Sequence, residues 1–150
     1  MIKVFHGSII EVSKPLVALG RPNLDFGQGF YVTDLQQQAE RWAKRMGVRR
    51  LMPSVLNVYQ FDLDTARNSA KYLKFDSYDK AWLDFIVGNR KGKMLWKGYD
   101  IIEGGIANDN VIDTVEDYIR GRMSAEAASL QSSTAGSKST FSETGSMMIL

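Results

Sequence analysis

The order of apolar and polar residues predicts a short strand at the start of the chain and a second strand soon after it. Apolar side chains within residues 2–5 favour a strand that places His6 and Gly7 at its end. Residues 14–26 contain two prolines, a glycine and an asparagine, which together are typical of a loop. Residues 27–33 (GQGFYVT) begin with a glycine hinge and continue into β-favouring residues, so they predict the second strand.

The residues after this second strand predict a helix. Apolar side chains recur there every three or four positions, at Leu35, Ala39, Trp42, Ala43 and Met46. We expect Asp34 to cap the helix and Gly47 to end it. Trp42 is accordingly expected to pack inward as a structural residue.

The second half of the chain predicts further strands and helices. Residues 55–63 alternate in polarity and predict a strand, residues 99–102 predict another, and residues 110–120 predict a helix that Gly121 ends. Between the two strands, a helix is predicted with one bulky face, made of Tyr78, Trp82, Phe85 and Ile86. The tail from residue 124 has a partly flexible composition, although residues 147–150 are apolar again.

Composition limits the classes of protein to which the chain can belong. Its 150 residues, 44% of them hydrophobic, are expected to form a single α+β domain over residues 1–150. The absence of cysteine excludes disulfides, thiolate metal sites and cysteine nucleophiles, and a single histidine excludes a histidine-rich metal site, so we expect no metal. No basic segment leads into an apolar stretch at the start, so a cytoplasmic protein with no membrane partner is expected.

Several familiar motifs are present only in part. Residues 25–27 (DFG) spell the magnesium-binding triplet of protein kinases, but the surrounding kinase motifs are missing. A catalytic triad would have to use His6, and no Gly-x-Ser-x-Gly elbow is present. The formal net charge of +2 implies no broad basic surface. A local cluster of basic residues over 44–50 leaves open an acidic partner or a nucleic acid.

Six segments in one order carry a resemblance to a known family. They are residues 5–8 (FHGS), 25–33 (DFGQGFYVT), 38–43 (QAERWA), 57–59 (NVY), 82–90 (WLDFIVGNR) and 106–109 (IAND). With these segments the chain resembles the bacterial DUF3990 family, within the His-Tyr-Glu group of the ADP-ribosyltransferase superfamily. The resemblance extends from Val4 to about Gly121.

The resemblance implies a fold and a substrate. The expected fold is α+β, with two small antiparallel sheets that face each other, flanking helices and a cleft that binds NAD as a substrate. In that family pattern, His6 holds a ribose hydroxyl of NAD, Gly7 binds the nicotinamide carboxamide through its backbone, and Tyr31 packs against the nicotinamide ring. The other residues expected to bind NAD are Ser8, Phe30, Thr33 and, at the pyrophosphate, Arg21 or Arg90.

The resemblance also implies an activity, which is mono-ADP-ribosyl transfer to a macromolecule, protein or nucleic acid. A late residue should assist the transfer together with His6 and Tyr31. Gln131 is our candidate, and Glu103, Lys138 and Glu143 remain alternatives. Similar small bacterial proteins are toxins of toxin-antitoxin pairs, which implies a small antitoxin protein as a further partner. The alternative is a non-catalytic NAD-binding or protein-interaction module on the same fold.

Overall fold

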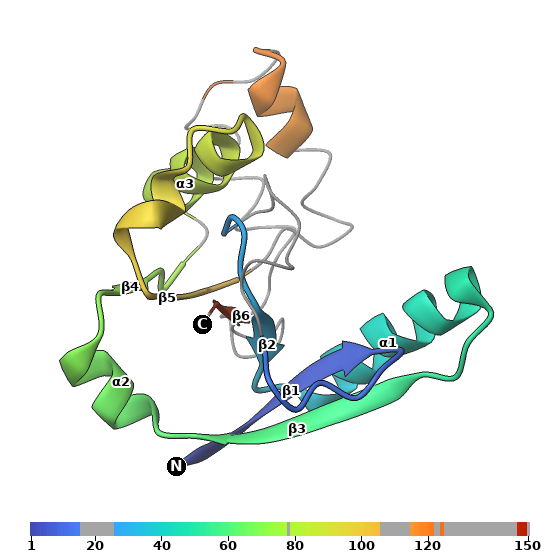
Figure 1. Cartoon of the computed structure of the whole chain (residues 1–150). Coiled ribbons are helices and arrows are strands. Elements are labelled where there is room, and N and C mark those ends of the chain that lie inside the picture. Colours follow the sequence, from blue (N-terminus) through green and yellow to red (C-terminus); the bar gives the residue numbers. More distant parts are fainter. Residues whose placement is uncertain (16–25, 78, 106–114, 122–123, 125–146, 150) are drawn as a thin grey trace.

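The computed structural model describes residues 1–15, 26–77, 79–105, 115–121, 124 and 147–149, and they have the expected α+β architecture (Figure 1). The strands are β1 (Ile2–Ser8), β2 (Tyr31–Thr33), β3 (Val55–Phe61), β4 (Tyr72–Lys74), β5 (Ile101–Gly104) and β6 (Met147–Ile149). The helices are α1 (Gln36–Arg50), α2 (Leu63–Ser69), α3 (Lys80–Arg90) and the short 3₁₀ helix η2 (Leu95–Gly98), and residues 115–119 are also helical.

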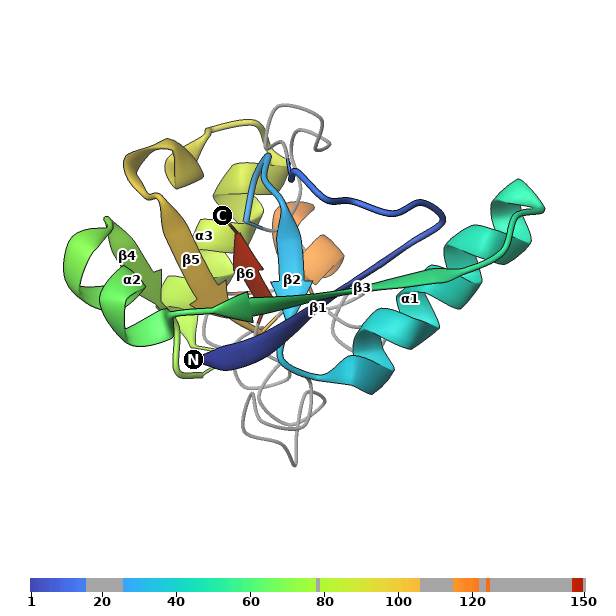
Figure 2. The ribbon, with the colours of Figure 1, turned by 60° about the horizontal axis from the view of Figure 1, so that its bottom comes forward.

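The strands form one hydrogen-bonded sheet in the order β3-β1-β2-β6-β5-β4. All neighbours are antiparallel except β4 and β5, which are parallel. The expectation of two separate antiparallel sheets is therefore wrong for the described strands. The reason is β6, which lies between β2 and β5 (Figure 2): Ile149 pairs with Tyr31 on one side and with Ile102 on the other.

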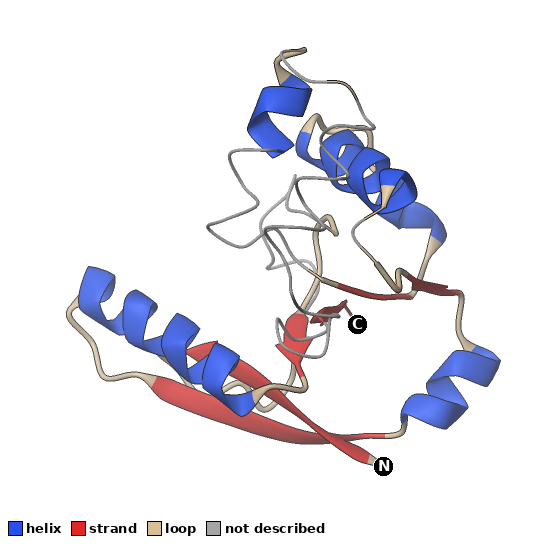
Figure 3. Cartoon of the chain, turned by 180° about the vertical axis from the view of Figure 1, so that it is seen from behind, coloured by secondary structure: helices blue, strands red, loops and turns tan. Residues whose placement is uncertain are grey.

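The register of the strands assigns each site residue to one of two sheet faces. Phe5 lies opposite Thr33, and side chains alternate along a strand, so Phe5, Gly7, Tyr31 and Thr33 share one face. This is the α1 face, because α1 lies over β1 and β3 there (Figure 3). His6 lies on the opposite face with Val4 and Val32. We call this opposite face the α2 face, since Leu63 of α2 packs against the cluster that contains Val4 and Val32.

Small side chains bring α1 close to β1. Ala39, Ala43 and Gly47 are the buried residues of α1, and a Cβ atom placed on Gly7 would lie 2.0 Å from the Ala39 carbonyl oxygen. Gly47 therefore packs inside α1 and does not end it, contrary to prediction. The helix continues to Arg50 and ends where Leu51 adopts a left-handed conformation.

Two further predictions for α1 are also wrong. Leu35, and not Asp34, occupies the N-cap position, and no side chain caps the helix there. Trp42 is 51% exposed, because the small residues on the neighbouring stripe of the helix make the contact with β1.

The larger hydrophobic core lies under α3. Trp82, Leu83 and Ile86 are fully buried there with Phe26 and Ile102, as the apolar face of the predicted helix requires. The Trp82 indole nitrogen donates a hydrogen bond of 2.7 Å to the Gly105 carbonyl. The prediction that Trp82 is structural is therefore confirmed, whereas Tyr78 lies outside the described residues.

We expect Gly7→Ala to lower the free energy of unfolding by about 3 kcal/mol, because the added methyl group overlaps the backbone of α1. Urea denaturation of the purified variant measures this loss. Gly98→Ala is the matched control, since a Cβ atom there meets nothing within 4 Å. An equal effect of the two substitutions would contradict the close contact at Gly7.

Candidate functional site

The single histidine of the chain is held by β2 in a defined orientation. Nδ1 of His6 lies 2.7 Å from the main-chain carbonyl oxygen of Tyr31, and the His6 ring lies 4.2 Å from the Phe30 ring, centroid to centroid. A carbonyl oxygen only accepts hydrogen bonds, so Nδ1 must carry the proton. In the neutral imidazole, Nε2 is then the acceptor.

The environment of His6 favours this neutral form. Burial lowers the pKa of His6 below its ordinary value of 6.5, and the hydrogen bond to the Tyr31 carbonyl opposes this shift only in part. At pH 7 the ring is consequently neutral. His6 can therefore accept a hydrogen bond from a ligand hydroxyl through Nε2 while Nδ1 keeps the ring oriented.

Strands β1 and β2 part next to this histidine. All residues of both strands are described, and only Phe5 and Thr33 pair across them. The register makes Gly7 and Tyr31 the next opposing residues beyond this pair, and the Tyr31 carbonyl accepts a hydrogen bond from the His6 ring. The His6-Gly7-Ser8 segment therefore lies beyond the paired residues of the ladder between β1 and β2.

The loop that follows β1 is fixed by two polar residues of β3. Buried Asn57, which pairs with His6, accepts a 2.9 Å hydrogen bond from the Val12 amide and donates one of 3.1 Å to the Ile10 carbonyl. The Tyr59 hydroxyl donates to the Val12 carbonyl at 2.5 Å. Sequence reasoning assigned Asn57 and Tyr59 no role, although both belong to the segment 57–59 that carries the family resemblance.

Tyr31 is anchored away from His6. Its hydroxyl donates to the Gly27 carbonyl at 2.6 Å and accepts from the Phe26 amide at 3.2 Å, while its ring packs against the core under α3. Gly27 has a positive φ of 85°, and Trp96 occupies the space that a side chain would need. The side chains of His6 and Tyr31 therefore project from opposite faces of the sheet, although the two residues touch through the Tyr31 carbonyl.

The other predicted site residues divide between the two faces. Ser8 ends β1 on the α2 face, and its hydroxyl accepts a hydrogen bond from the Ile10 amide at 3.4 Å. Phe30 is buried on the same face beside His6. Thr33 lies on the α1 face, where its hydroxyl donates to Gln38 at 2.5 Å and accepts from the Leu35 amide at 3.1 Å.

Glu103 occupies a polar cluster on β5. Its carboxylate accepts hydrogen bonds from the Tyr72 hydroxyl and from Arg67, whose Nη2 lies 3.2 Å from Oε2. Burial, and then the hydrogen bond to Glu103, raise the pKa of Tyr72 to about 12. Glu103 shares the α2 face with Val32, because both pair with Met148.

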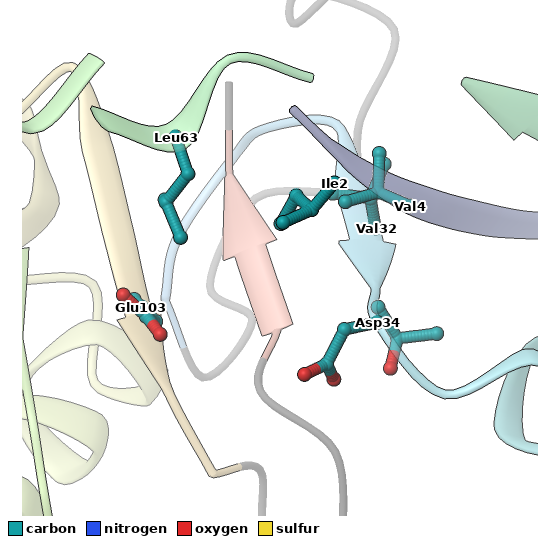
Figure 4. A pocket seen from close by; sticks show the side chains of 7 residues that line it. Ile2, Val4, Val32, Asp34, Leu63 and Glu103 are labelled. Carbon is teal, nitrogen blue, oxygen red and sulfur yellow. The ribbon is translucent and has the colours of Figure 1, made fainter. Parts of the chain in front are cut away.

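A small pocket on the α2 face ends at Glu103 (Figure 4). Figure 4 shows Glu103 entering it from β5 and Asp34 from the end of β2, with apolar walls from Ile2, Val4, Val32 and Leu63. Its volume of about 40 Å³ holds a water molecule or two, which is too little for a nicotinamide ring. Glu103 therefore lies in a site too small for the expected substrate.

Four of the predicted residues cannot be placed. Arg21, Gln131, Lys138 and Glu143 lie outside the described residues, and Glu103 is the one late candidate within them. Arg90 ends α3 and is half-buried. In the described ranges, no three His, Cys, Asp or Glu residues gather as a metal site would require. No helix in that part of the chain is long and apolar enough to cross a membrane.

The fold and the site define an α+β protein with a neutral, oriented histidine where two central strands part. Comparison with protein families identifies the particular group: the family described as "Protein of unknown function (DUF3990)" matches residues 2–142. The chain belongs to the DUF3990 family. No curated protein and no solved structure shows significant similarity to it.

We expect the stability of the folded protein to fall more steeply on acidification with His6 than without it. Because folding lowers the pKa of His6, the unfolded chain binds a proton more readily below about pH 6.5, so acid favours unfolding. Thermal unfolding at pH 7 and pH 5 should show a larger decrease in Tm for the wild type than for His6→Gln. Proton NMR of this single histidine tests the cause directly, and a pKa at or above 6.5 would contradict it.

Proposed function

We propose that the protein is an NAD-dependent mono-ADP-ribosyltransferase that modifies a macromolecule. The observation that carries the proposal is the 2.7 Å hydrogen bond from His6 Nδ1 to the Tyr31 carbonyl. It leaves Nε2 as an acceptor, which is what binding a ribose hydroxyl requires. The order of the segments 5–8 and 25–33, which resembles the superfamily pattern, supports the same substrate.

NAD is proposed to bind beside His6, where the ladder between β1 and β2 ends. In the proposed complex, His6 accepts a hydrogen bond from the nicotinamide ribose. Main-chain groups at Gly7, where the ladder with β2 has ended, bind the carboxamide. Phe30, which already contacts the His6 ring, and Ser8 border the ribose on the same face. Thr33 lies on the α1 face, where its hydroxyl donates a hydrogen bond to Gln38 and so connects β2 to α1.

The proposed reaction breaks one bond and forms another at the same carbon. The bond between the ribose C1′ and the nicotinamide nitrogen breaks, and its electron pair leaves with nicotinamide. A lone pair of the acceptor then bonds to C1′, and the proton of the acceptor passes to a base. Hydrogen bonds to the ribose that strengthen as positive charge develops on the ring stabilise the transition state.

Tyr31 is the residue whose proposed role the geometry makes most specific. Its hydroxyl is engaged by the Gly27 turn, so its contribution to NAD binding would come from the ring edge and from the carbonyl that orients His6. Removing the hydroxyl and removing the ring are thus expected to have different effects. Gln131 remains the proposed late catalytic residue, and a toxin role with a small antitoxin partner remains part of the proposal.

One observation favours a second candidate, a module that binds NAD without transferring ADP-ribose. Glu103, the one late candidate within the described part of the chain, is held by Arg67 and Tyr72. It lies three strands from His6 in the sheet order, which is roughly 14 Å at the usual strand spacing. A carboxylate at that distance, already paired with a cation, is poorly placed to act on an acceptor beside His6.

Nicotinamide release from NAD, with cell lysate as the source of acceptor, tests the proposal. The wild type should release nicotinamide only with lysate, and His6→Ala should lower the rate by about a hundredfold because the ribose loses its hydrogen-bond acceptor. Tyr31→Phe should keep most of the activity, whereas Tyr31→Ala should lose it together with the ring.

Tyr99→Ala is the matched control, because Tyr99 is an exposed tyrosine on the turn before β5. Thermal unfolding of each variant separates loss of the fold from loss of the site. Binding of NAD by calorimetry without release of nicotinamide would favour the non-catalytic module. Neither binding nor release would overturn both candidates.

A further inference from the structure

Exposed basic residues are concentrated on helix α1. Residues 41–61 contain five basic side chains and no acidic one, which leaves the other 129 residues with a formal net charge of −3. The basic residues all belong to α1 and are exposed: Arg41, Lys44, Arg45, Arg49 and Arg50. Among the described residues, Lys44, Arg49 and Arg50 form no ion pair with an acidic side chain.

Apolar side chains are exposed on the same helix and on the turn that follows it. Leu51 is 93% exposed, Val48 77% and Trp42 51%, and Met52 beside Leu51 is also exposed. Trp42 and Val48 lie on α1, and Leu51 and Met52 lie on the turn that follows it. The end of α1 that carries this turn points away from α3 (Figure 1). The backbone places Leu51 outward, since it adopts the left-handed conformation that ends α1. We call these four apolar residues and the five basic ones the α1 docking surface.

We propose that the α1 docking surface binds an acidic protein partner through an amphipathic helix with an apolar stripe flanked by carboxylates. The charge of the surface is complementary to such a partner, in contrast to the net negative charge of the rest of the chain. Arginine, tryptophan and methionine, all present here, are the residue types enriched at protein interfaces. At about 22 Å, α1 is long enough to pair with a helix of several turns.

The aliphatic residues favour a protein over a nucleic acid. Phosphates would satisfy the arginines and lysines, but a sugar-phosphate backbone gives Leu51 and Val48 little apolar surface against which to be buried. A helix with leucines on one stripe buries them and gains about 25 cal/mol for each Å² removed from water. This inference does not depend on NAD binding, because the docking surface lies on the α1 side of the sheet and His6 on the other.

Fluorescence anisotropy with a defined probe tests the inference. The probe is a labelled 18-residue helical peptide of leucine, alanine and glutamate, with its leucines on one stripe, and a labelled 20-base-pair DNA duplex is the comparison. The wild type should bind the peptide more tightly than the DNA. Arg49→Glu with Arg50→Glu should weaken peptide binding by at least about tenfold, and Leu51→Ser by about fivefold.

The controls match each change elsewhere on the molecule. Lys91→Glu with Lys93→Glu makes the same change in net charge at exposed residues after α3. Met94→Ser removes an exposed apolar side chain from a residue with the same φ of 54° as Leu51. Both controls should bind the peptide like the wild type. The inference is overturned if the peptide does not bind, if DNA binds as tightly, or if Leu51→Ser has no effect.

Discussion

The contact between α1 and β1 at Gly7 determines where the other parts of the site lie. A glycine there lets the helix backbone approach the strand to a distance that no side chain permits, and Ala39 and Ala43 complete the contact from the helix. With that face of β1 covered by α1, the alternation of the strand directs His6 to the opposite face. The pairing of His6 with Asn57, its contact with Phe30 and its hydrogen bond to the Tyr31 carbonyl all follow from this orientation.

The same alternation separates the two residues that the family pattern treats as one site. His6 can offer Nε2 to a ligand on the α2 face, whereas the Tyr31 ring stabilises the core under α3 and its hydroxyl holds the Gly27 turn. The two meet through a main-chain carbonyl, which fixes the His6 tautomer without any contribution from the Tyr31 ring. A substitution at Tyr31 that preserves the backbone should therefore leave the state of His6 intact. This is why the ring and the hydroxyl of Tyr31 must be tested separately.

Local signals in the sequence predicted the parts of the fold that depend on local interactions. The first two strands, most of α1 and the buried face of α3 follow from periodicity and were found. Helix α2 and strand β4 were missed because both depend on contacts with β5. Strand β4 has three residues and pairs with β5 in parallel, and Arg67 of α2 donates a hydrogen bond to Glu103 of β5. The strand that carries His6 was predicted, although β1 continues through His6 to Ser8. The partner of the His6 ring was not predicted, since the Tyr31 carbonyl reaches it only through the register of β1 against β2. The exposure of Trp42 likewise depends on which stripe of α1 packs against the sheet. The formation of a single sheet depends on β6, which lies near the end of the chain.

The opposite locations of the His6 site and the α1 docking surface limit how one can influence the other. A partner on the outer side of α1 leaves the α2 face uncovered, so it cannot exclude NAD by occupying the site beside His6. The closest connection from α1 to the His6 site is the backbone contact of Ala39 with Gly7, which is the residue next to His6 in β1. Because that contact leaves no space for a methyl group, a shift of α1 toward β1 must displace β1 as well. A partner that moves α1 toward the sheet can therefore alter the position of β1 beside β2, whereas one that leaves α1 in place binds independently of NAD.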